Sequence, residues 1–405
     1  MAKTFYINDF LRLVGAEILK DYYASINVSF DYDKNLNSEN LIDFVLDHYK
    51  NLDDETQDRV TRDLREVNEM TAYAGEELLK TGAKRSKVKT PDNFEDYSQY
   101  DTALWFFMNE YSLFDKASTL FELQDAVGWR DVFVPQVSNA KAAKKRKVFE
   151  AALRQHLQDK ELKGRYCIVE KYNKDGKLFF VAFPQDYAQA DYHYSSATKL
   201  NDRVVRIPIF KIYFKYDSSI GMLSVKTKGG KEKAENYQKI FCKHVLDHEM
   251  STEDQKIYDL NQIKDVNFSL PTGPEMEYVK IKSVTLLYYD KSLRLTLDLN
   301  DDSKLGLDDF HYRAKQLGIP LDFVNVVSAK FYFNFKPPKN RTKGSRSTVT
   351  AQVSFPNSHS FADKPLHNKA RDYLQNWGIT KKQDEEIATT YLEPPVSTGS
   401  DKDSN

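Results

Sequence analysis

The spacing of apolar residues changes near residue 165, and this change limits the available folds more than any other feature of the sequence. Before it, apolar residues recur every three to four positions, as in LIDFVLDHY at 41–49, which is typical of helices with one buried face. After it, RYCIVEKY, NKDG and KLFFVAF (165–183) predict a β-hairpin closed by an Asp-Gly turn. We therefore predict an α+β fold, with a mainly helical domain over residues 1–160 and a strand-rich domain over residues 165–380.

The strand-rich part repeats a hairpin followed by a helix. The strand pairs are KIYFKY with MLSVKT, KSVTLLYY with LRLTLDL, and AKFYFNF with STVTAQVSF, and the helices span about residues 231–248, 307–317 and 365–377. A hairpin with one helix cannot bury its own apolar face. The copies should therefore join in one antiparallel sheet with helices packed on one side. The polar residues 381–405 are expected to form a disordered tail.

Composition and cysteine usage indicate where such a chain works. Hydrophobic residues make up 40% and charged residues 29% of 405 residues, which suits a globular protein with more than one core. Cys167 and Cys242 lie far apart without a CxxC motif, which favours a reducing compartment. The N-terminal segment lacks the pattern of a signal peptide, and no apolar run is long enough for a membrane helix. We expect a cytoplasmic protein that does not contact membranes.

Common catalytic and cofactor motifs do not occur in the sequence. It contains no GxxxxGK[ST] phosphate-binding loop, no GxGxxG and no GxSxG. No cofactor is therefore expected, and the absence of these motifs argues against an enzyme. Because catalytic carboxylates can come from separate strands, a metal-dependent nuclease remains an alternative.

Two segments resemble metal sites without matching them. His244 and His248 are one helical turn apart, but Val245 stands where a zinc protease has its glutamate, so a helix C-terminus is the preferred interpretation. The loop DLNDDSKLGLDD resembles a calcium loop but has Ser303 in place of the glycine that the sharp turn needs. A polar loop is preferred there, and no metal is expected. The loop's candidate ligands are Asp298, Asn300, Asp302 and Asp309.

Charge is unevenly distributed along the chain. Residues 1–80 carry a net charge of −8 and residues 141–249 a net charge of +10, although the whole chain has −1. The two strongest basic elements are a predicted helix start and the tip of the last hairpin, KPPKNRTKGSR. Their cations are Lys144, Lys145, Arg146 and Lys147, and Lys336, Lys339, Arg341, Lys343 and Arg346.

Lysine and arginine clusters of this kind bind nucleic acid phosphates, and a two-stranded ribbon fits a DNA major groove. The alternative is a solvated charged face that keeps a hairpin soluble and protects its edge. A tyrosine-rich stretch, FPQDYAQADYHYSS, could stack bases through Tyr187, Tyr192 and Tyr194, although such rings more often cover a sheet edge.

Three short phrases carry a resemblance to known sequences. IYDLNQI (257–263), FPNSHS (355–360) and LQNWGI (374–379) are similar to phrases in an uncharacterised bacterial protein family with no assigned activity. The resemblance implies a bacterial source and supplies no site residue.

These observations lead to one functional hypothesis and two alternatives. We expect a non-enzymatic, cytoplasmic nucleic-acid-binding or adaptor protein whose two basic elements form one surface, with a role in bacterial (antiviral) defence or regulation. The acidic N-terminal helices would contact a protein partner. The alternatives are the metal-dependent nuclease and a structural subunit that binds only other proteins.

Overall fold

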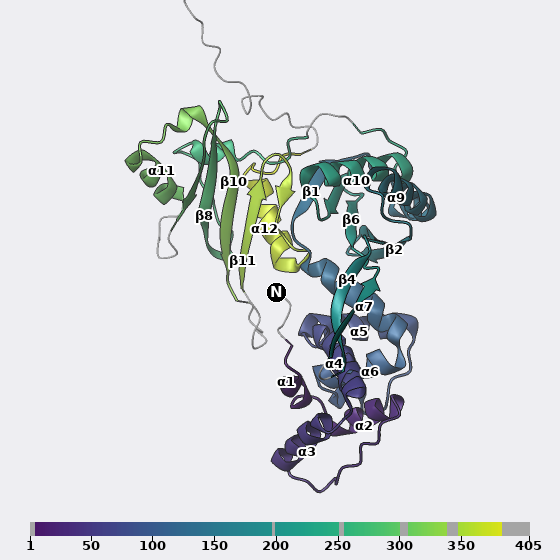
Figure 1. The fold of residues 1–405 in the computed structure, drawn as a ribbon. Coiled ribbons are helices and arrows are strands. Elements are labelled where there is room, and N and C mark those ends of the chain that lie inside the picture. Colours follow the sequence, from purple (N-terminus) through teal and green to yellow (C-terminus); the bar gives the residue numbers. More distant parts are fainter. Residues whose placement is uncertain (1–4, 197–198, 251–254, 300–306, 338–346, 383–405) are drawn as a thin grey trace, which may run out of the picture. The chain divides into compact units, whose positions relative to one another are not determined.

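The computed structural model describes residues 5–196, 199–250, 255–299, 307–337 and 347–382, with the backbone alone for residues 191–204 (Figure 1). It consists of two compact units, Met1–Asp125 and Ala126–Asn405. Helices form the first unit, and a large antiparallel sheet with helices forms the second, which confirms the predicted α+β fold. The predicted disordered tail from residue 383 onward lies outside the described residues.

The first unit is helical, and polar side chains cap several of its helices. Asn37 and Asp53 each accept a hydrogen bond from a backbone N–H in the following turn, and Ser98 forms a reciprocal capping box with Asp101. Val60, Leu64 and Val67 share one buried face, as their helical spacing predicts. The helices are α1 (Ile7–Leu11), α2 (Ala16–Ser25), α3 (Ser38–Lys50), α4 (Asp54–Glu69), α5 (Tyr73–Ser86), the short 3-10 turn Phe94–Asp96, α6 (Gln99–Asn109) and α7 (Tyr111–Asp125).

The second unit is built on an antiparallel ten-stranded sheet and a separate two-stranded ribbon. The sheet order is β2-β3-β6-β7-β1-β12-β11-β10-β8-β9, and the ribbon pairs β4 with β5. The strands are β1 (Trp129–Phe133), β2 (Cys167–Lys174), β3 (Lys177–Pro184), β4 (Gln189–Ser196), β5 (Lys199–Arg206), β6 (Ile212–Asp217), β7 (Met222–Lys226), β8 (Met276–Tyr288), β9 (Arg294–Asp298), β10 (Val324–Phe335), β11 (Thr348–Ser354) and β12 (Ser358–His359). The helices are α8 (Asn139–Lys144), α9 (Arg146–Glu161), α10 (Gly230–Val245), α11 (Leu307–Gln316) and α12 (Pro365–Asn376), with short 3-10 turns at Asn261–Lys264 and Leu321–Phe323.

The three predicted hairpin-plus-helix copies are present as β6-β7-α10, β8-β9-α11 and β10-β11-α12. In the third copy Phe331 pairs with Ala351 and Phe333 with Val349, and all four side chains are buried against α12. The second and third copies are adjacent in the sheet through β8 and β10, whereas the first copy is separated from the third. β1 and the two-residue strand β12 lie in the middle of the sheet and join β7 to β11.

Helices α8 and α9 belong to the second unit. The sequence pattern, in contrast, predicts them as part of a helical domain over residues 1–160. The reason lies in the apolar stripe of α9. The ring centroid of Phe149 lies 4.9 Å from that of Phe214 and 5.3 Å from that of Phe241, so α9 and α10 share one core with the sheet. Helical spacing shows that a helix has a buried face but does not show which core it joins.

The described part of the chain contains no helix with both the length and the apolar character that a membrane span requires.

Candidate functional site

Strands β8, β10 and β11 lie side by side and carry two kinds of side chain on their two faces (Figure 1). Because side chains alternate along a strand, every second residue of β10 joins the core beneath α12, as Phe331 and Phe333 do. The intervening residues Lys330, Tyr332 and Asn334 are partly or fully exposed. This outer face is called the tyrosine–lysine face below, and it is polar, aromatic and basic. Its central members are Tyr278, Lys280, Lys282, Lys330 and Tyr332.

Strand register determines which of these side chains are neighbours. Tyr332 lies opposite Lys280 on β8 and opposite Thr350 on β11. Tyr278 lies opposite Asn334, which places the two tyrosines on a diagonal of the same face. A register shift places Lys282 between two pairs of the strand ladder, since Ile281 pairs with Phe331 and Ser283 with Lys330. We interpret this shift as a β-bulge that adds a cation beside the rings.

The tyrosines and lysines are in direct contact. The ring centroids of Tyr278 and Tyr332 lie 6.1 Å apart with an interplanar angle of 28°. Lys280 Nζ lies 5.2 Å from the centroid of Tyr278, and Lys282 Nζ lies 4.8 Å from that of Tyr332. These are cation–π distances. Tyr278 is 40% exposed, so planar aromatic surface and ammonium groups are presented together.

The basic KPPKNRTKGSR segment follows one end of this face in the sequence. Asn334 pairs with Thr348, and the N–H of Phe335 donates to the carbonyl of Ser347, after which the chain enters the KPPKNRTKGSR segment. Lys336 is exposed, and its N–H donates to the carbonyl of Glu275. The other predicted phosphate-binding residues of this segment, Lys339, Arg341, Lys343 and Arg346, lie outside the described residues.

The KKRK element has structural partners that the sequence did not indicate. α8 ends at Lys144 and α9 begins at Arg146, so the cations surround a break between two helices. Lys145 Nζ lies 3.2 Å from Asp247, and Lys147 Nζ lies 2.7 Å from Glu150. Arg146 donates from Nη1 to the carbonyl of Val169 over 2.6 Å. Lys144 is exposed, and a role of the four cations in nucleic-acid binding stays a prediction.

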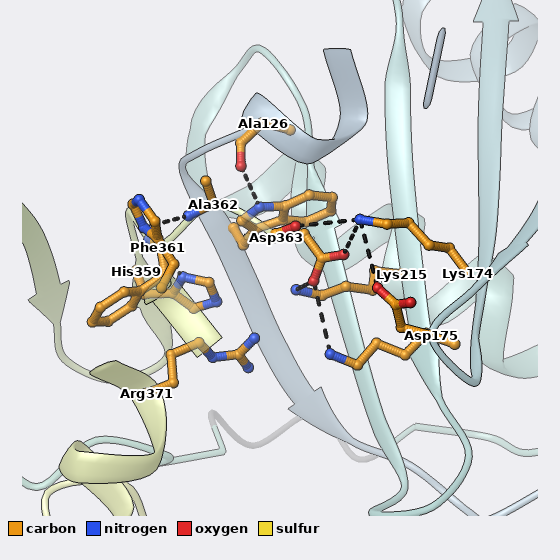
Figure 2. A network of polar contacts seen from close by, with 12 residues as sticks. Ala126, Lys174, Asp175, Lys215, His359, Phe361, Ala362, Asp363 and Arg371 are labelled. Carbon is orange, nitrogen blue, oxygen red and sulfur yellow. Dashed lines mark hydrogen bonds and ion pairs between the residues drawn. The ribbon is translucent and has the colours of Figure 1, made fainter. Parts of the chain in front are cut away.

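A cluster of buried charged residues lies where β1, β6, β12 and α12 meet (Figure 2). Asp131 is 1% exposed, and its Oδ2 accepts a hydrogen bond of 2.9 Å from the hydroxyl of Tyr258. The same oxygen lies 3.3 Å from Nε2 of His359 and 4.0 Å from a terminal nitrogen of Arg371. Since Nδ1 of His359 accepts from the N–H of Phe361, we assign the imidazole proton to Nε2, facing Asp131.

A second carboxylate, Asp363, belongs to the same cluster. Figure 2 shows it directed toward Lys215 and Lys174. Asp363 lies 3.6 Å from Lys174, 3.7 Å from Lys177 and 4.0 Å from Lys215, measured between charged atoms. Lys215 Nζ also lies 4.8 Å from the ring centroid of Trp129. Among the described residues, no acceptor forms a hydrogen bond with this buried ammonium group.

Burial shifts the pKa values in this cluster in different directions. The pKa of Lys215 is lowered to about 7, mainly by desolvation and also by Arg371, while Asp363 and Asp131 oppose the change. Desolvation also lowers the pKa of His359 to about 4. For Asp131, desolvation favours the neutral acid, but His359, Arg371 and Lys215 outweigh it and hold the pKa below its usual range. At neutral pH the cluster therefore pairs an ionised Asp131 with a neutral imidazole.

Few features of the sequence indicate this cluster. Asp131 and Lys215 stand inside the short apolar strands WRDVF and IYFKYD, and a charge in an apolar strand was the one available signal. Asp131, Lys215, His359 and Asp363 are each at most 3% exposed, so a dissolved substrate does not reach them in this conformation. The arrangement instead ties β1 and β6 to β12 and α12.

Two other segments singled out in the sequence are the tyrosine-rich stretch and the histidine pair near the end of α10, and their described residues have structural contacts. The hydroxyl of Tyr187 donates to the carbonyl of Glu161, and the side chains of Tyr192 and Tyr194 lie outside the described residues. α10 ends at Val245, and the N–H of His248 donates to the carbonyl of Cys242 over 3.0 Å, a helix C-terminal arrangement.

Asp298 ends β9, whereas Asn300 and Asp302 lie outside the described residues. Within the described ranges, no group of three metal-ligating side chains gathers.

Comparison of this chain with models of protein families and with the curated proteins finds no match.

Proposed function

We propose that this protein binds nucleic acid through the tyrosine–lysine face, together with the basic segment that follows it, as a non-enzymatic binding or adaptor protein. One observation supports the proposal most directly: Lys280 and Lys282 lie at cation–π distance from the rings of Tyr278, which is 40% exposed, and Tyr332, which is half-buried. Ammonium groups attract phosphates, and aromatic rings attract bases. Lys330 and Lys336, which are exposed on the same hairpin, add positive charge before and after Tyr332 along the strand.

The proposal assigns different roles to the other charged parts of the chain. Lys339, Arg341, Lys343 and Arg346 would add phosphate contacts beyond the face, and Lys144, an exposed member of the KKRK element, would add another. The acidic first unit would contact a protein partner. Cys167 and Cys242 are both buried free thiols, which supports a reducing, cytoplasmic setting.

Fluorescence anisotropy with labelled oligonucleotides, titrated at several salt concentrations, tests the proposal. Each phosphate contact contributes about −0.7 to −0.9 to the slope of the logarithm of the binding constant against the logarithm of the salt concentration. The triple variant Lys280→Gln, Lys282→Gln, Lys330→Gln should bind more weakly and with a smaller salt slope than the parent. The control, Lys84→Gln, Lys87→Gln, Lys89→Gln, removes the same charge from exposed lysines of the first unit and should bind as the parent does.

A second variant tests the basic segment. Reversing Lys339, Arg341 and Lys343 to Glu should weaken binding without lowering the melting temperature. A parent protein that binds neither single strands nor duplex, DNA or RNA, at low salt contradicts the proposed function.

A further inference from the structure

Two contiguous stretches of the chain make up the second unit, and each has its own apolar core. Residues 126–250 contain β1 to β7 with α8, α9 and α10, and residues 255–382 contain β8 to β12 with α11 and α12. The first stretch, called the α9 lobe below, surrounds the core that includes Phe149. The second, called the α12 lobe, surrounds the core that includes Phe333.

Strand pairing between the two lobes is short. β12 spans Ser358–His359, and these two residues pair with β1 on one side and with β11 on the other. The N–H of Asp131 also donates to the carbonyl of Asn357 over 2.9 Å. Within the α12 lobe, by comparison, β10 pairs with β11 from Ser328 to Asn334. Strand pairing therefore holds the lobes together less firmly than it holds the strands within a lobe.

Apolar contact between the lobes is also limited. Within the described ranges, the side chains of the α9 lobe that join or pack against the core of the α12 lobe are those of Met222 and Phe133. They form one cross-strand pair at neighbouring ends of β7 and β1. Interfaces inside a chain permit relative motion unless they are large and apolar.

The contacts of the buried charged cluster run from one lobe to the other. Its carboxylates are Asp131 in the α9 lobe and Asp363 in the α12 lobe. The partners of Asp131 in the α12 lobe are Tyr258, His359 and Arg371. The partners of Asp363 in the α9 lobe are Lys174, Lys177 and Lys215. The cluster is therefore an interface between two lobes, and Figure 2 shows part of it.

Closing this interface leaves buried polar atoms without hydrogen bonds. Among the described residues, none forms a hydrogen bond with Nζ of Lys215, Oδ1 of Asp131 or Oδ1 of Asp363. A buried polar atom without a partner is destabilising relative to its hydrated state. Buried ion pairs add little net stability, because desolvation opposes their attraction. Opening returns these groups to water, so the interface opposes opening less than an apolar core would.

Protons favour the open form. Burial lowers the pKa of Lys215 from 10.5 to about 7 when the lobes are closed, and exposure to water restores its ordinary value. Between these values the open form binds a proton that the closed form lacks, so opening becomes more favourable as the pH falls toward 7. The charged and titratable groups that face Lys215 are Asp131 of β1, Lys177 of β3, His359 of β12, Asp363 and Arg371 of α12.

From this arrangement we propose that the second unit opens between the α9 lobe and the α12 lobe while both cores stay folded, and that proton uptake by Lys215 favours the open form. The tyrosine–lysine face belongs to the α12 lobe, so opening changes the position of this face relative to the α9 lobe and leaves the face itself intact. The inference does not depend on the proposed function.

Hydrogen–deuterium exchange of the full-length protein, measured by mass spectrometry at pH 7, 8 and 9, tests the proposal. Peptides that cover β1 and β12 report on the junction, and peptides that cover β3 and β10 report on the two cores. After correction for the intrinsic effect of pH on exchange, junction amides should be about tenfold or more less protected than core amides. Their protection should increase with pH by up to about tenfold per unit.

Two variants connect the pH dependence with the buried amine. Lys215→Met should abolish the pH dependence of the junction amides. Lys171→Met, at an exposed position of β2, is the matched control and should keep it. Urea should increase exchange at the junction less steeply than exchange in the cores, because opening exposes less surface than global unfolding does.

Two results in the parent protein overturn the proposal. Junction and core amides with equal protection and equal urea dependence would show that the lobes separate only when the whole unit unfolds. Junction protection that stays constant from pH 7 to pH 9 would show that opening takes up no proton at Lys215. Both measurements decide the matter even if Lys215→Met fails to fold.

Discussion

Arg146 donates a hydrogen bond from its guanidinium to the carbonyl oxygen of Val169 over 2.6 Å, and the N–H of Val169 donates to the carboxylate of Glu150 over 2.9 Å. β2 is the terminal strand of the sheet. These two backbone groups of Val169 therefore lie on its unpaired side, away from β3, where α9 contacts them. An open strand edge is a template for pairing with other chains. Two side chains of α9 therefore occupy part of this edge, which gives Arg146 a structural reason for its position in the KKRK element.

The first prediction concerns this edge contact. Arg146→Met removes a charge-assisted hydrogen bond to a backbone carbonyl and should lower the free energy of unfolding by about 1.5–3 kcal/mol. Lys147→Met removes a largely exposed ion pair with Glu150 and should cost less than about 1 kcal/mol. Urea denaturation of the two variants measures the difference. Equal losses would show that the Val169 contact contributes nothing beyond surface charge.

A second prediction concerns the buried carboxylate of Asp131. Asp131→Asn leaves His359, Tyr258 and Arg371 around a neutral amide and should lower the free energy of unfolding by about 3–5 kcal/mol. Asp175→Asn is the matched control, because its carboxylate is exposed and lies 3.6 Å from Lys174. The control should change stability by less than about 1 kcal/mol. A small loss in Asp131→Asn would mean that the cluster does not depend on this charge.

A third prediction is a pH dependence caused by Lys215. Its pKa is lowered by burial from 10.5 to about 7 in the folded protein. Between these values the unfolded chain binds a proton that the folded chain lacks, so stability rises with pH by up to about 1.4 kcal/mol per pH unit from this group. Below pH 7 both states hold the proton, and this contribution to the slope disappears.

Urea unfolding at several pH values between 7 and 9.5 measures this slope. Lys215→Met should flatten it, whereas Lys171→Met, at an exposed position of β2, should keep the parental slope. An unchanged slope in Lys215→Met would contradict the shifted pKa.

The fourth prediction concerns the Asp-Gly turn between β2 and β3. Asp175 and Gly176 have φ values of 51° and 75°, as a two-residue hairpin turn of this type requires. A Cβ on Gly176 would meet no atom within 4 Å, so only backbone conformation opposes a side chain there. Gly176→Ala should cost about 1–2 kcal/mol, and Gly176→Asn less, because asparagine tolerates left-handed backbone. Thermal unfolding ranks the two variants, and the reverse order would contradict this explanation.

The elements whose conformation depends on residues close together in the sequence were predictable from it. The Asp-Gly hairpin, the three hairpin-plus-helix copies and the buried row that includes Phe331, Phe333 and Val349 all follow from alternation and turn residues. The tyrosine–lysine face was open to the same reasoning, because Tyr278, Lys280 and Lys282 alternate along one strand. A search for runs of consecutive cations does not find it, because its lysines are spaced two residues apart along the strand.

The middle of the sheet could not be predicted in the same way. Trp129 pairs with His359 from a two-residue strand, and no local pattern marks so short a segment. Asp131, Lys215 and Asp363 resemble surface charges when the sequence is considered alone.

Local pattern by itself determined the class of fold, the hairpins and their buried faces, because alternation and turn chemistry act between near neighbours. Tertiary structure alone decided that α9 completes the sheet unit, that Arg146 covers part of a strand edge, and that distant charges meet in a buried cluster. Those outcomes depend on which surfaces come together when the chain folds, and residue spacing does not contain that information.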